Sequence, residues 1–61
     1  MSQQWAKPWV VRVVGPNEET EYMLVNFSDA KAAKERVENI VKANPKTAGW
    51  RVEDPVEPRQ V

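Results

Sequence analysis

Apolar residues dominate both faces of a short stretch near the start of the chain. Over residues 9–14 only Arg12 is polar. Because side chains alternate along a strand, one face carries Trp9, Val11 and Val13 and the other carries Val10, Arg12 and Val14. A strand that is apolar on both faces is typical of the centre of a sheet.

A turn and a second strand are predicted next. Residues 15–20 contain the glycine, proline and asparagine of a turn, so the flanking stretches are expected to form a hairpin. The second strand spans residues 21–27. One of its faces carries Met23, Val25 and Phe27. The other carries Tyr22, Leu24 and Asn26.

Helical spacing replaces alternation after residue 27. Ser28 is predicted to be the N-cap, and the helix extends to about Ala43. Asn44-Pro45 ends it, because the residue before a proline disfavours helical backbone. The expected apolar stripe consists of Ala30, Ala33, Val37, Ile40 and Val41. A third strand over residues 50–53 places Trp50 and Val52 inward and Arg51 and Glu53 outward.

This β-β-α-β order predicts an α+β fold. Three antiparallel strands in the order 2-1-3 form a sheet, and one helix packs on one face. The 61 residues form a single domain, 1–61, with an ordered core of about 8–55 and flexible segments at 1–7 and 56–61. One helix covers one face of a sheet, so the second face is expected to bind a partner.

Composition argues against catalysis. The chain has no cysteine and no histidine, which excludes disulfides, the usual nucleophile–base pairs and tetrahedral zinc sites built from these residues. The acidic pairs Glu18-Glu19 and Glu53-Asp54 are expected to be solvated. We therefore predict no enzyme activity, no metal and no cofactor. Met1–Gln4 lacks signal-peptide character and no apolar run spans a bilayer, so a cytoplasmic protein without membrane insertion is expected.

The face away from the helix supplies the candidate binding residues. Arg12, Tyr22, Leu24 and Arg51 are predicted to contact a protein partner, because aromatic and arginine side chains are enriched in interfaces. Trp5 is expected either to fold back on the sheet or to anchor a partner. The other tryptophans, Trp9 and Trp50, are predicted to be core residues.

Two other uses of this face are weighed below protein binding. A symmetric homodimer through the open sheet is second. Single-stranded nucleic acid is third, because nine basic residues balance nine acidic ones and Tyr22 is the only ring on this face. If a protein partner binds this face, charge reversal at Arg12 and Arg51 is expected to abolish binding without unfolding the protein.

Three features resemble a known family. They are the aromatic-led strand Pro8-Trp9-Val10-Val11, the single amphipathic helix, and the string Ala48-Gly49-Trp50-Arg51-Val52. Over roughly residues 9–58 the chain resembles the small T7-type phage inhibitor of host RNA polymerase. The resemblance implies a phage protein that binds a bacterial host enzyme in the host cytoplasm and blocks it without catalysis. That family presents arginines along its last strand to an acidic partner, whereas here Glu53 and Asp54 follow Arg51.

Overall fold

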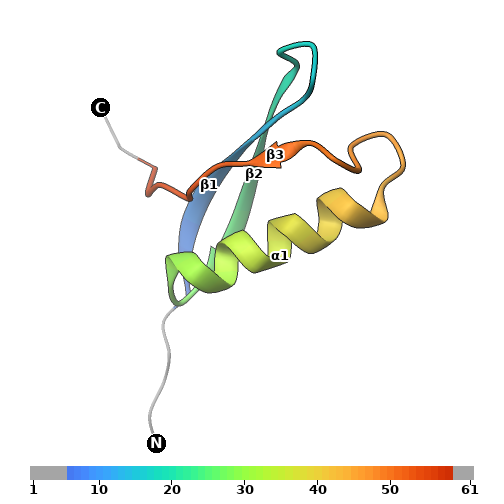
Figure 1. Ribbon diagram of the computed structural model, residues 1–61. Helices are drawn as coiled ribbons and strands as arrows, with labels where there is room; N and C mark the ends of the chain where they lie inside the picture. Colours follow the sequence, from blue (N-terminus) through green and yellow to red (C-terminus); the bar gives the residue numbers. More distant parts are fainter. Residues whose placement is uncertain (1–5, 59–61) are drawn as a thin grey trace, which may run out of the picture.

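The computed structural model describes residues 6–58. It contains strands β1 (Lys7–Val14) and β2 (Thr20–Phe27), helix α1 (Ala30–Ala43) and strand β3 (Arg51–Val52). The strands form one antiparallel sheet in the order β2-β1-β3, and α1 packs on one face of it (Figure 1). The predicted α+β fold, strand order and single covering helix are therefore confirmed.

The core lies between β1 and α1. Trp9, Val11 and Val13 are buried on the inner face of β1, as the alternation predicted. Val11 and Val13 form one cluster with the helix residues Val37 and Val41. Four residues of the predicted apolar stripe are buried or half-buried, namely Ala30, Ala33, Val37 and Val41. The prediction for Ile40 was wrong, since its side chain is 36% exposed. It lies beside the line of residues spaced four apart that faces the sheet.

The helix begins one residue later than predicted. Asp29, not Ser28, is the N-cap, and its side chain accepts a hydrogen bond of 2.8 Å from the Ala32 backbone N–H. The predicted helix end at Ala43 is confirmed, and Asn44 before Pro45 has extended backbone, with φ −97° and ψ 117°. The buried Thr47 closes this end, because its hydroxyl donates to the Val41 carbonyl oxygen at 3.0 Å.

A close approach of Trp50 to Gly15 fixes the end of the β1–β2 hairpin. A Cβ atom on Gly15 would lie 2.8 Å from Cε2 of Trp50, so only glycine fits without a shift. The Gly15 N–H donates to the Glu19 carbonyl oxygen at 2.8 Å, and Glu18 has a positive φ of 66°. The indole of Trp50 is half-buried and packs against the core, as predicted.

The chain continues to pair with β1 after β3 ends. Glu53 donates its N–H to the Arg12 carbonyl oxygen, and Val56 and Val10 exchange backbone hydrogen bonds of 2.8 and 2.9 Å. Asp54 and Pro55 together lie opposite Val11, which is the two-against-one arrangement of a β-bulge. Pro55 suits this position because it has no N–H to pair.

The paired part of the chain is longer at both ends than the predicted ordered core. Lys7 belongs to β1 and Val56 is bonded to Val10, although both were assigned to terminal segments. The predicted flexibility of residues 1–5 and 59–61 concerns positions outside the described residues.

Candidate interaction surface

The sheet face opposite α1 is the candidate surface, and we call it the open face. Residues that lie directly opposite each other in antiparallel strands project to the same side, so the register defines rows across the sheet. The rows on the open face are Leu24–Val10–Val56, Tyr22–Arg12–Glu53 and Thr20–Val14–Arg51. Each row takes one residue from β2, one from β1 and one from the C-terminal part of the chain.

The row Leu24–Val10–Val56 is an apolar strip that solvent reaches, and we call it the apolar row. Leu24 is 67% exposed and Val56 is 58% exposed, while Val10 between them is half-buried. The sequence placed Val10 and Leu24 on this face but did not identify Val56. Strict alternation from Arg51 and Glu53 would put residue 55 outward, and the bulge moves this position to residue 56.

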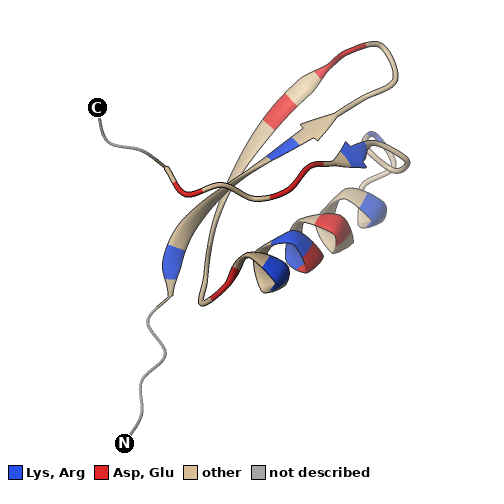
Figure 2. Ribbon diagram, turned by 60° about the vertical axis from the view of Figure 1, so that its left-hand side comes forward, with Lys and Arg blue, Asp and Glu red and all other residues tan. Residues whose placement is uncertain are grey.

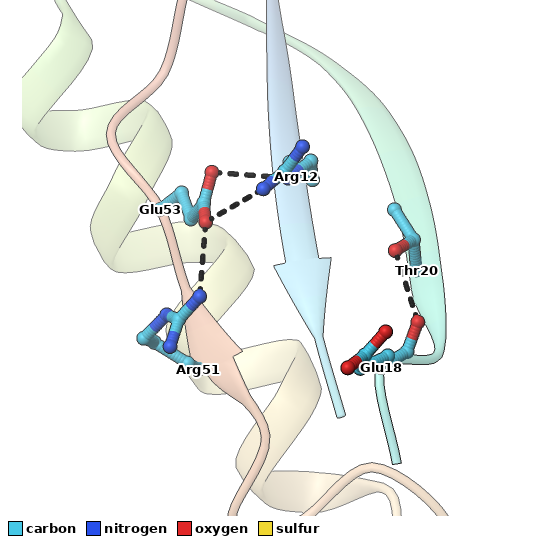
Figure 3. A network of polar contacts seen from close by, with 5 residues as sticks. All are labelled: Arg12, Glu18, Thr20, Arg51 and Glu53. Carbon is cyan, nitrogen blue, oxygen red and sulfur yellow. Dashed lines mark hydrogen bonds and ion pairs between the residues drawn. The ribbon is translucent and has the colours of Figure 1, made fainter. Parts of the chain in front are cut away.

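Beside the apolar row, Arg12, Glu53 and Arg51 form a cluster of ion pairs (Figure 3). Nε and Nη2 of Arg12 bind the two carboxylate oxygens of Glu53 at 3.0 and 3.1 Å. Nη2 of Arg51 binds Oε2 of the same carboxylate at 3.2 Å. The two-point contact fixes the Arg12 guanidinium in the plane of the carboxylate. We call these three side chains the Arg–Glu cluster.

The cluster keeps its members charged. Hydrogen bonds from Arg12 and then Arg51 hold the pKa of Glu53 below its ordinary value, and the hydrogen bond to Glu53 raises the pKa of Arg12. The cluster therefore carries two positive charges and one negative charge at neutral pH. The Arg51 side chain is 70% exposed and the Arg12 side chain is 47% exposed. The cluster is therefore expected to contribute little to the free energy of unfolding.

Four of the five predicted contact residues lie together on the open face. Arg12 and Tyr22 are directly opposite each other, and Tyr22 is 66% exposed. Leu24 belongs to the apolar row and Arg51 to the Arg–Glu cluster. The fifth, Trp5, lies outside the described residues.

The structure adds Glu53 as the residue that sequence reasoning undervalued. Arg12 and Arg51 were predicted only as residues that contact a partner, whereas one carboxylate of the chain itself binds both. Glu53 was expected to face outward, but its partners depend on how β3 is aligned with β1. The spacing of 41 residues between Arg12 and Glu53 gives no local signal of this contact.

Further ion pairs hold the C-terminal part of the chain to the rest. Lys34 of α1 binds Asp54 at 3.0 Å, and Lys7 of β1 binds Glu57 at 3.1 Å. Lys7 also lies 5.3 Å from the centre of the Trp9 ring, whose N–H donates to the Phe27 carbonyl oxygen. Acidic and basic residues are interspersed along α1 (Figure 2), so the helix has no single sign of charge.

The helix side of the molecule offers a weaker candidate. A hollow of about 210 Å³ is lined by Glu38, Val41, Lys42, Gly49, Trp50 and Val52. Its polar groups are one carboxylate and one ammonium, with no nucleophile between them. Among residues 6–58, no three acidic side chains gather where they would hold a metal ion. The same part of the chain contains no helix long and apolar enough to cross a bilayer.

No protein-family model, curated protein or solved structure matches this chain. The geometry of the open face is therefore the basis for a functional proposal.

Proposed function

We propose that this protein is a non-catalytic protein-binding module and that its partner contacts the open face. The exposed apolar row beside the Arg–Glu cluster carries the proposal, because α1 covers only the opposite face of the sheet (Figure 1). Interfaces combine an apolar centre with aromatic and arginine side chains. The open face supplies all three in adjacent rows.

The geometry also indicates what the partner presents. An apolar surface on the partner would cover Leu24 and Val56, and Tyr22 would offer a hydroxyl at the side of that contact. Glu53 neutralises one of its two arginines, so the cluster attracts an acidic partner only weakly. An apolar ridge with hydrogen-bond acceptors at its border is the best match.

The resemblance to phage inhibitors leads to a narrower form of the proposal. In that form the protein occupies a functional surface of a bacterial host enzyme and blocks it, and host RNA polymerase is the first enzyme to test. The Arg–Glu cluster favours a target that is less acidic than the one implied by the resemblance. Single-stranded nucleic acid is a weaker candidate, because phosphates would compete with Glu53 for both arginines.

The experiment compares capture of partners by tagged variants from nuclease-treated bacterial lysate. Val56→Asp puts a charge in the apolar row, and Ala48→Asp adds the same charge in the loop between α1 and β3. We expect a stoichiometric protein with the unchanged chain and with Ala48→Asp, but not with Val56→Asp. Circular dichroism verifies that both variants fold, and purified bacterial RNA polymerase is tested directly with the same three proteins.

Retention of the partner by folded Val56→Asp would contradict the proposal. This variant is preferable to charge reversal at Arg12 and Arg51. Reversal would surround Glu53 with two further carboxylates, so that a disturbed cluster could not be separated from a lost contact.

A further inference from the structure

Strand β2 has a free edge whose orientation follows from the hydrogen bonds of β1. Val10 directs both its N–H and its carbonyl group toward Val56, and Arg12 accepts from Glu53. Backbone groups alternate in direction along a strand. The intervening β1 residues, Trp9, Val11 and Val13, therefore bond to β2, where they lie opposite Val25, Met23 and Glu21.

The remaining residues of β2 direct their backbone groups away from the sheet. These residues are Thr20, Tyr22, Leu24 and Asn26. No described strand covers this edge, because β2 is the outermost strand of the order β2-β1-β3. The free donors and acceptors thus belong to the same residues whose side chains lie on the open face.

This edge lacks the features that prevent strand addition. Its pairing with β1 continues without a bulge from Lys7↔Phe27 to Val14↔Thr20. Its eight residues include no proline, no lysine and no glycine, and Glu21 is the only charge. Long, regular and apolar edge strands bind further strands unless such features interrupt them.

The helix side of β2 is also incompletely covered. Met23, Val25 and Phe27 face α1 but are only half-buried, whereas Val11 and Val13 of β1 are fully buried. A strand added to β2 would bring its own inward side chains beside these three. The missing cover is therefore on the same edge as the free backbone groups.

We infer that two copies of this chain pair through β2, antiparallel, about a two-fold axis at Met23. The two sheets then join into one of six strands. Residues whose backbone groups point to the free edge must pair with one another. This places Tyr22 opposite Leu24 of the partner subunit and Thr20 opposite Asn26 of the partner subunit. The arrangement forms two aromatic–aliphatic pairs, and Glu21 meets the partner subunit's Val25.

Two other alignments of the two strands are less favourable. An axis at Glu21 would place two carboxylates directly opposite each other, which is destabilising. An axis at Leu24 forms one Leu–Leu pair in place of two Tyr–Leu pairs. The inference does not depend on the proposed function, since self-association and capture of another protein are measured separately.

The first measurement is the mass of the full chain by sedimentation equilibrium over a wide range of concentration. We expect a species of twice the chain mass and an apparent stability that rises with concentration. A monomer at every concentration would overturn the inference.

Single cysteines locate the axis, because the natural chain contains none. Met23 would lie opposite its own copy in a pair without mutual hydrogen bonds, with the Cα atoms about 4.5 Å apart, within reach of a disulfide. We expect Met23→Cys to form covalent dimers on oxidation. The matched control is Val25→Cys, whose two copies would be four residues out of register, about 14 Å along the strand.

Cross-linking of Met23→Cys alone supports the inference. Cross-linking of both variants, or of Val25→Cys alone, would overturn it. A dimeric mass without a Met23→Cys cross-link would also overturn it and would favour contact through the open face.

A charge-exchange test avoids any change in the core. Tyr22 and Leu24 are both about two-thirds exposed, so their replacement is expected to preserve the monomer fold. The double variants Y22K/L24K and Y22E/L24E should each be monomeric, because like charges would meet in both cross-strand pairs. An equal mixture should regain the dimeric mass, and failure of the mixture to associate would contradict the register.

Discussion

At the scale of single residues, Glu53 determines how the open face is charged. The alternation predicted that Arg12 and Arg51 point outward, and the structure agrees. Their shared contact with one carboxylate was not predictable, because it requires the register between β1 and a strand of only two residues. Side-chain direction follows from local pattern, whereas a contact across the sheet depends on the alignment of distant segments.

Glu53→Gln is expected to lower the free energy of unfolding modestly at neutral pH. The folded state lowers the pKa of Glu53 through Arg12 and Arg51. This stabilisation is present above the unfolded pKa of about 4.3 and is lost as pH falls through the lower, folded value. The difference between the natural chain and Glu53→Gln should therefore shrink in acid, as measured by urea unfolding at several pH values. Glu35→Gln on α1 is the control, and equal stability of Glu53→Gln and the natural chain at pH 7 would contradict the expectation.

Val37 provides a test of the packing of the core. It is fully buried against β1, so Val37→Ala is expected to cost about 2 kcal/mol through lost burial and a residual cavity. Val56→Ala removes the same atoms from a side chain that is 58% exposed and should change stability by about 0.5 kcal/mol or less. Chemical denaturation of both variants measures the contrast. Similar losses would mean that Val56 is buried in solution.

At the scale of elements, local sequence predicted the type and order of the strands and helix but not every boundary. The helix end at Ala43 was predicted from Asn44-Pro45. The start was wrong by one residue, because Ser28 and Asp29 are both good N-cap residues and adjacent in the chain. The bulge at Asp54 and Pro55 was missed, since it is defined by the partner strand.

The two N-cap candidates predict different effects on α1. Asp29→Ala should destabilise the protein by about 1 kcal/mol, because the Ala32 N–H loses its acceptor. Ser28→Ala should have little effect. Thermal unfolding and helical circular dichroism compare the two variants, and a larger loss for Ser28→Ala would mean that the helix begins one residue earlier.

The hairpin end gives a test of the Gly15–Trp50 contact. Gly15→Ala introduces a methyl group 2.5 Å from Oε1 of Glu19, whose flexible side chain can move, and 2.8 Å from the Trp50 ring, and overpacking of this kind costs about 1–3 kcal/mol. The tryptophan fluorescence of the chain, to which Trp50 contributes with Trp5 and Trp9, is expected to shift as the Trp50 ring moves. Asn17→Ala in the same turn is the control, and unchanged stability and fluorescence of Gly15→Ala would show that the ring does not contact Gly15.

At the scale of the whole molecule, β1 is held between the two halves of the chain. Its odd-numbered residues bond to β2 through a local hairpin, and its even-numbered residues bond to segments about 40 positions later. The prediction of β1 as the central strand is confirmed, and Val10 and Val14 are half-buried between its two neighbouring strands although no helix covers their face. The extent of the distant pairing was underestimated, because residues 54–58 contain two prolines and few apolar side chains.

A chain that ends after Asp54 would lose the hydrogen bonds between Val10 and Val56 and keep those between β1 and β2. The Val10 N–H would lose its acceptor, Val56, and should exchange its hydrogen with solvent faster. The Val11 N–H, which faces β2, should stay protected. Amide exchange followed by NMR measures both sites in one sample. Equal acceleration at Val10 and Val11 would instead indicate general loosening of the sheet.

The two edges of the sheet, β2 and the segment that contains β3, differ in regularity. This difference would limit the number of subunits in the proposed assembly. In the proposed dimer both β2 edges are consumed, and the edges that remain are formed by the segment after Gly49. That segment is two residues of regular strand followed by a bulge and Pro55, which gives an incoming strand little to bind. In the proposed dimer, growth would therefore stop at two subunits. A chain with two regular edges would instead add further copies at both, so in the proposed dimer Pro55 and its bulge would limit assembly to two subunits.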